Sequence, residues 1–104
     1  MSRGVVVVFR SIPDPEHAQE YAEWQERIDA LLPTVQGFRS IKSFVAEDGE
    51  RCSVSEFDSI EDIDRWKAQA EHMQAQALGK QRFYLEYSYQ TCDVLRAHEF
   101  RRAE

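Results

Sequence analysis

The sequence predicts an α+β domain of the ferredoxin-like class, with an antiparallel sheet in β-α-β-β-α-β order and both helices on one face. Three observations predict it: a short β-branched run near the N-terminus, two segments with helical apolar spacing, and two strand-like segments separated by a tight turn. The 104 residues suit one domain. We expect one domain over residues 1–104, with its core at about 4–96 and a polar tail at 97–104.

The first half of the chain predicts a strand followed by a helix. Val5–Phe9 is β-branched and aromatic, which is typical of a strand buried on both faces. Pro13 interrupts the strand, and Asp14 is a predicted N-cap with Pro15 at the first helical position. Pro33 ends the helix. One helical face is apolar and consists of Tyr21, Trp24, Ile28, Leu31 and Leu32.

The middle of the chain predicts a β-hairpin. Phe38–Ala46 and Arg51–Phe57 have strand composition, and Glu47–Glu50 is rich in turn residues. Ser59 followed three residues later by Asp62 resembles a capping box, so a second helix should begin here.

The last third predicts an interrupted helix and a long strand. Ile60, Ile63 and Trp66 form an inward stripe, and a break is expected near Gln69. The helix should resume and end at Gly79 as its C-cap. Finally, the segment 83–95 is predicted to be a strand rich in tyrosine and phenylalanine.

Composition and charge exclude some partners. Thirteen basic and nineteen acidic side chains give a net charge of −6, which disfavours nucleic acid and an anionic membrane surface. Cys52 and Cys92 show no metal-binding spacing; the two could in principle pair, but we expect free, buried thiols in a reducing cytoplasm. The valine run is too short for a signal peptide or a membrane span, so a cytoplasmic location is expected.

The predicted architecture leaves apolar surface uncovered. Both helices occupy one face of the sheet, so the other face and one edge stay exposed. The last strand is also longer than the usual five or six residues. A homodimer with two sheets packed face to face would solve both problems, and we expect one.

Three stretches of the sequence resemble a known family. These are Pro33 with Gly37-Phe38, the strand end Glu56-Phe57-Asp58-Ser59, and the run Trp66…His72…Ala75-Gln76…Gly79-Lys80…Phe83-Tyr84…Tyr87. Together with the element order, they resemble the antibiotic biosynthesis monooxygenase superfamily of dimeric α+β barrels, over about residues 4–96.

The resemblance implies a homodimer with a pocket between sheet and helices in each subunit. Characterised cofactor-independent members oxidise a phenol or hydroquinone to a quinone with O2, without flavin or metal. The expected function is therefore a cofactor-independent monooxygenase, whose partners are a small aromatic molecule and O2 and which needs no cofactor. Its protein would desolvate and deprotonate the substrate.

The candidate site combines one base with several pocket-wall residues. His72 is the candidate catalytic base, because an imidazole exchanges protons near neutral pH. A surface or turn-capping role is the alternative. The candidate substrate-binding residues, each equally compatible with packing, are Trp66, Gln76, Trp24, Tyr21, Tyr84 and Tyr87. Strand alternation places Tyr87 and Tyr89 on one face and Tyr84 on the other.

Two other functions stay open from the sequence. One is a non-catalytic dimeric α+β barrel that binds a small ligand. The other is a haem-binding or haem-degrading monooxygenase, whose branch has an Asn on the first strand and a His about ten residues after the Trp. This sequence has no Asn, and Gln76 stands ten residues after Trp66.

Overall fold

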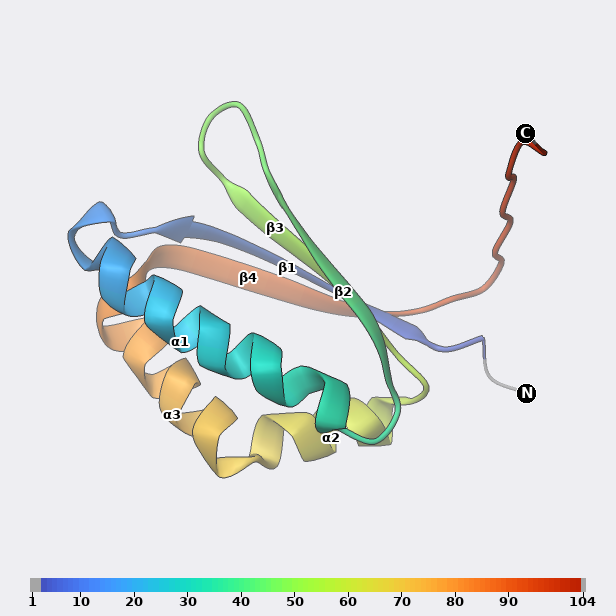
Figure 1. Cartoon of the computed structure of the whole chain (residues 1–104), viewed down its shortest axis with the longest axis horizontal. Helices are drawn as coiled ribbons and strands as arrows, with labels where there is room; N and C mark the ends of the chain where they lie inside the picture. The colour runs from blue at the N-terminus through green and yellow to red at the C-terminus, as the bar shows by residue number, and fades with distance from the viewer. Residues whose placement is uncertain (1–2, 104) are drawn as a thin grey trace.

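The computed structural model describes residues 3–103, except for the side chains of residues 70–73. Four antiparallel strands form one sheet in the order β2-β3-β1-β4. The strands are β1 (Val5–Pro13), β2 (Phe38–Val45), β3 (Arg51–Phe57) and β4 (Tyr84–Asp93). The helices α1 (Ala18–Leu31), α2 (Ile60–Ala68) and α3 (Ala70–Leu78) lie on one side of this sheet (Figure 1). The predicted fold class and element order are confirmed.

The connection from β1 to α1 follows its local sequence. Asp14 caps a 3-10 turn, Pro15–His17, by accepting a hydrogen bond at 3.0 Å from the backbone N–H of Glu16. The helix proper begins one residue later, and Pro33 lies in a second 3-10 turn after α1. The strand ends at Pro13, as predicted, but of its residues Val5–Phe9 only Val5 is fully buried.

The start of α2 is the predicted capping box. Ser59 Oγ accepts a hydrogen bond from the backbone N–H of Asp62 at 3.2 Å and donates to the Asp62 carboxylate at 2.8 Å. Arg65 adds an ion pair to the same carboxylate at 2.7 Å. Gly37 packs directly against this cap with a φ of +84°, and a Cβ there would collide with the Asp62 carboxylate. These contacts hold α2 beside the start of β2.

The buried core lies at one end of the sheet. It consists of Val5, Leu32, Phe57, Ile63 and Trp66. Because Val5 and its i+2 neighbour Val7 both pack into this cluster, they point toward the helices. The alternate residues of β1 therefore point to the face that no helix covers.

The segment between α3 and β4 differs from the prediction. The break at Gln69 is confirmed, but Gly79 is not a left-handed cap: its φ is −58°, and the chain continues through a π-helical turn, Gly79–Phe83. A Cβ on Gly79 would lie 2.9 Å from Cε2 of Tyr84. Close packing against a ring, rather than a turn of positive φ, is the local reason for glycine here.

A bulge in β4 overturns the alternation predicted for its tyrosines. Glu86 pairs with Ile12, but Tyr84 pairs with Pro13, so Leu85 is the extra residue. The bulge turns Tyr84 to the side of Tyr87, and their ring centroids are 5.6 Å apart. The strand also ends at Asp93, two residues earlier than predicted.

The cysteines and the tail lie outside the core. Cys52 pairs across the sheet with Arg10, and Cys92 with Val6, on opposite sides of β1, so the two thiols are free. Cys52 is half-buried and Cys92 is exposed, so the prediction of buried thiols is wrong. Residues 94–103 have no regular secondary structure. Figure 1 shows them leaving the body of the molecule.

Candidate functional site

An aromatic cluster lies at the end of the sheet away from the core. Phe9 is its centre, and its ring centroid is 5.4 Å from that of Tyr87, 5.6 Å from Tyr84 and 6.4 Å from Tyr89. Tyr21 on α1 joins it through an edge contact with Tyr84 at 5.7 Å. Phe9 lies two residues after Val7 in β1 and therefore points to the same face of the sheet as the core. The aromatic cluster, which consists of Phe9, Tyr21, Tyr84, Tyr87 and Tyr89, thus faces the helices.

The hydroxyl groups of the cluster are electrostatically distinct. Burial raises the pKa of Tyr84 well above its ordinary value, and the nearby Tyr21, which also hydrogen-bonds it, raises it further. Tyr84 therefore stays neutral and can donate a hydrogen bond, but it cannot serve as a base. Tyr89 accepts a hydrogen bond from Lys67 Nζ at 3.2 Å, with the ammonium 4.4 Å from the ring centroid.

An open cleft of about 890 Å³ adjoins the cluster at Tyr21. Its walls come from the end of β1, the first three turns of α1 and the hairpin turn between β2 and β3, which rises away from α1 in Figure 1. The lining carries five carboxylates and two guanidinium groups, from Asp14, Glu26, Asp29, Asp48, Glu50, Arg10 and Arg51. Ile12, Pro13, Ala18 and Ala22 supply apolar surface.

The two arginines of this cleft have defined partners. Arg10 holds Glu50 in a two-pronged ion pair at 2.9 and 3.1 Å. Arg51 lies over the ring of Tyr21, with its guanidinium carbon 5.4 Å from the centroid. A cation beside the exposed edge of a phenol ring can stabilise an anion bound there. Tyr21 is thus the residue that joins the cleft to the aromatic cluster.

The predicted site residues divide into two groups. Tyr21, Tyr84 and Tyr87 come together in the aromatic cluster. The remaining described candidates lie elsewhere and do not line the cleft. Trp66 belongs to the buried core at 6% exposure.

Trp24 is half-buried, with the Arg27 guanidinium carbon 4.4 Å from its ring centroid. Gln76 is exposed on α3. His72 belongs to α3, but its side chain lies outside the described residues. Its role as a base therefore stays a prediction.

Sequence reasoning missed the polar lining of the cleft. Glu26 and Asp29 have the composition of a solvated helix face, and Arg51 looks like an ordinary residue after a turn. They line one space only because the hairpin stands opposite α1. The helical spacing of Ala22, Glu26 and Asp29 places them on one face, which is the signal available in the sequence.

The break before α3 contains a buried polar atom without a partner. Within the described part of the chain, the side-chain oxygen of Gln69 is buried and accepts no hydrogen bond. Such an acceptor costs stability unless a donor reaches it. Gln69 lies in neither the cleft nor the aromatic cluster, so its unpaired oxygen is a feature of the helix break and not of the candidate site.

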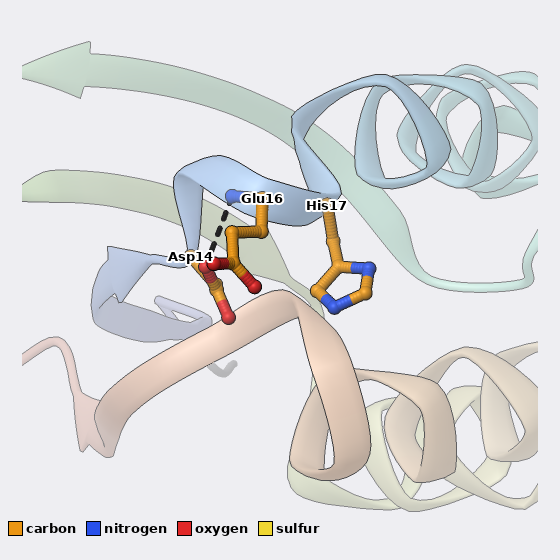
Figure 2. Close-up of side chains that lie close together, drawn as sticks. All are labelled: Asp14, Glu16 and His17. Atoms are coloured by element: carbon orange, nitrogen blue, oxygen red, sulfur yellow. Dashed lines mark hydrogen bonds between the residues drawn. The ribbon is translucent and has the colours of Figure 1, made fainter.

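A second group of polar side chains lies at the entrance to α1 (Figure 2). Ligand atoms of Asp14, Glu16 and His17 all lie within 4.8 Å of one another. Carboxylate and imidazole are metal-ligand types. Here the proximity follows from the 3-10 turn that Asp14 caps, so the grouping gives no independent sign of a metal.

Among residues 3–103, no helix is both long and apolar enough to cross a membrane.

Comparison with known proteins identifies the family. The family model for antibiotic biosynthesis monooxygenase matches residues 4–78. The chain is 31% identical over 94 residues to a Bacillus subtilis protein named uncharacterized protein YqjZ, covering 90% of this chain and 82% of that one.

Two solved structures illustrate the shared fold. Rv0793 from Mycobacterium tuberculosis superposes with a TM-score of 0.81 at 15% identity, covering 92% of this chain and 99% of that chain. SnoaB from Streptomyces nogalater, a cofactor-independent oxygenase, has a TM-score of 0.76 at 14% identity, covering 90% and 95%. At these identities the structures establish only a common fold. With the family model spanning most of its length, this chain belongs to the antibiotic biosynthesis monooxygenase family.

Proposed function

We propose that this protein is a monooxygenase that oxidises a small phenol or hydroquinone with O2 and needs no added cofactor. One observation carries the proposal: in a chain of this monooxygenase family, an aromatic cluster opens at Tyr21 into a cleft of about 890 Å³. Cavities of this size class accommodate small organic ligands. The family relationship supports this reaction class, and the cleft is the proposed substrate site.

In the proposed reaction the substrate is its own reductant. A phenol with a free para carbon and one O2 give a para-quinone and one water. One oxygen atom enters the ring, the other leaves as water, and all four electrons come from the phenol. A hydroquinone has no free para carbon, so with one O2 it would instead give the quinone and hydrogen peroxide, with two electrons from the substrate and no oxygen atom entering the ring. The protein must remove the phenolic proton and hold the electron-rich anion away from bulk water.

The described residues suggest roles in this chemistry. The exposed part of Tyr21 would pack against the substrate ring. Arg51, whose guanidinium lies over the Tyr21 ring, would stabilise the phenolate form of the substrate relative to the neutral phenol. Tyr84, whose pKa is raised by burial, would remain neutral and donate a hydrogen bond. We propose His72 as the base, because it is the imidazole in the segment that follows Trp66.

Oxygen uptake tests both the activity and the base. With a panel of hydroquinones and naphthols, the wild-type chain should consume one O2 per quinone formed. His72→Ala should lower kcat by about 10²–10⁴-fold, the range for loss of a general base, with unchanged urea unfolding. The matched control is His17→Ala, outside the cleft lining, which should leave kcat unchanged.

The contrary outcomes are equally specific. Normal turnover by His72→Ala would remove His72 from the mechanism. Saturable binding of aromatics without any O2 uptake would make the protein a ligand-binding member of the fold. A Soret shift on adding haem would instead favour the haem branch.

We also propose that the protein acts as a homodimer. The face of the sheet without helices carries Val8 paired with Val54 and Phe44 paired with Cys52, and Phe44 is 50% exposed. Packing two such faces together would bury these side chains. Sedimentation of the wild-type chain at micromolar concentration should give twice the chain mass, whereas Phe44→Glu should shift it toward the monomer.

A further inference from the structure

We propose that the C-terminal tail of a second copy of this chain docks into the acidic cleft and closes it. The tail is the segment 94–103, and the cleft is the one lined by α1, the end of β1 and the β2–β3 turn. The proposal rests on the homodimer proposed above and is independent of the oxygenase activity.

The tail exposes large apolar side chains instead of packing them against its own domain. Among the residues that the structure describes, its hydrogen bonds to the domain lie at its start, where the backbone N–H of Val94 donates to the carbonyl of Gly4 at 3.2 Å and Arg3 donates to the carbonyl of Leu95. Its apolar side chains Leu95 and Phe100 are 81% and 83% exposed. Large apolar groups exposed on an extended segment are typical of a site that binds another surface.

The overall dimensions agree with an unpacked tail. The radius of gyration is 14.9 Å. A compact domain of this length would have a radius of gyration of about 13 Å. The difference corresponds to the segment that Figure 1 shows leaving the body of the molecule.

The tail and the cleft are complementary in charge and polarity. From residue 94 on, the sequence carries three arginines, Arg96, Arg101 and Arg102, against two acids, Glu99 and Glu104. The cleft carries five carboxylates against two guanidinium groups, and one guanidinium is already paired with Glu50. Its apolar floor, which includes Tyr21, offers a place for the Phe100 ring. Opposite charges around an apolar contact favour docking in one orientation.

The geometry of β4 directs the tail to another copy. Asp93 pairs with Val5 and Tyr84 pairs with Pro13, so the tail leaves the sheet at the end opposite the cleft. The distance back along β1 is about 26 Å at the usual rise per residue. Phe100 is seven residues beyond Asp93 and reaches about 24 Å when fully extended. To approach the Tyr21 side of its own cleft, Phe100 would therefore have to reverse at once and stay fully extended, which a tail arriving from a second copy need not do.

A reciprocal exchange would complete each site. In a two-fold dimer, each tail would reach the other subunit's cleft, so both sites would close together. Phe100 would then cover the open side beside Tyr21, and Arg101 and Arg102 would meet Glu26 and Asp29. Covering the cleft excludes water, which strengthens every electrostatic interaction inside it.

Cysteine cross-linking tests the contact directly. In a full-length chain with Cys52→Ser and Cys92→Ser, Phe100→Cys combined with Ala22→Cys should give a disulfide-linked dimer under mild oxidation. The matched control replaces Ala22→Cys with Ala30→Cys, an exposed α1 position outside the cleft lining. It should give little covalent dimer.

Two outcomes of that experiment would overturn the proposal. Equal dimer yields from the two pairs would mean random collision. An internal disulfide at monomer mass would mean that the tail folds onto its own cleft. Because cross-linking needs no turnover, a chain that cross-links but consumes no O2 would refute the proposed function and leave this contact standing.

A charge exchange provides an independent test. Arg101→Glu with Arg102→Glu should weaken the dimer about tenfold, as should Glu26→Arg with Asp29→Arg. All four substitutions in one chain should restore the wild-type dimer constant, because an acidic tail would then meet a basic cleft. Additive weakening of the quadruple variant in sedimentation would contradict the docking.

Discussion

The two ends of the sheet differ although the same strands build them. At the inner end, Val5, Phe57 and Trp66 pack with the helices into a core in which each is no more than 6% exposed. At the outer end, Tyr87 and Tyr89 on the same helix-facing side are 37% and 48% exposed. The difference shows that one amphipathic sheet face can serve as a core at one end and as a binding surface at the other.

The helices explain the difference. At the inner end, Leu32 and the α2 residues Ile63 and Trp66 close over the sheet. At the outer end, the hairpin turn rises away from α1 and leaves the cleft between them. Tyrosine suits this half-covered position, because its ring packs while its hydroxyl remains available to a partner.

The largest expected effect comes from truncating one aromatic residue at each end. Trp66→Ala should lower the free energy of unfolding by about 3–5 kcal/mol, since it leaves a cavity in the core. Tyr89→Ala, with its half-exposed ring, should cost about 1 kcal/mol. Urea unfolding with an unchanged m-value measures both. Equal losses would contradict the distinction between a closed and an open end.

A smaller effect is expected at the cap that positions α2 over the core. Ser59→Ala should cost about 1 kcal/mol, because the N-cap loses its acceptor. The hydrogen bond from Ser59 is the main cause that holds the pKa of Asp62 below its ordinary value, and the hydrogen bond from Arg65 is the second. The variant should therefore raise that pKa in an NMR titration. The matched control is Ser40→Ala, whose hydroxyl contacts the exposed Glu56 at 2.9 Å.

The sign of the Asp62 contribution follows from the direction of its shift. The folded state binds the Asp62 proton more weakly than the unfolded state does. Its stabilisation is therefore present above the unfolded-state pKa and is lost as the pH falls through the folded-state pKa. An unchanged acid unfolding profile in Ser59→Ala would show that Arg65 alone sustains the shift.

The smallest effect is expected at the outer end, from Tyr84→Phe. Removing the hydroxyl loses its polar interaction with the neighbouring Tyr21, so the expected loss of stability is only about 0.5 kcal/mol. In the wild-type chain, the ionisation of Tyr84 should be displaced to high pH, because burial raises its pKa. Its stabilisation is present below the unfolded-state pKa and is lost as the pH rises toward the folded-state value. Absorbance titration of folded wild-type and variant chains would show whether that late step disappears.

Local sequence signals predicted the elements well. Asp14, Ser59 and the hairpin turn before Arg51 act through neighbours a few residues away, so their effects are legible in the sequence. The Leu85 bulge and the π-helical turn at Gly79 escaped prediction. Both depend on how β4 packs against β1 and the end of α3, and this packing involves residues distant in the chain.

The candidate site was less predictable than the fold. Tyr21 and Tyr84 were recognisable as aromatic candidates, but their contact depends on the bulge that turns Tyr84 toward α1. Glu26 and Asp29 carried no individual signal, because a charged residue on an amphipathic helix is ordinarily solvated. Trp66 was a candidate substrate-binding residue on the sequence, and the structure places it in the buried core.

The sequence by itself determined the α+β class, the order of the elements, the caps at Asp14 and Ser59 and the family resemblance. These depend on apolar periodicity and on short-range hydrogen bonding, which are written in contiguous residues. Only the tertiary structure decided that the sheet closes at Trp66 and opens at Tyr21, and that the cleft is acidic. Those properties arise where α1 and the hairpin, distant in the chain, face each other across the end of β1.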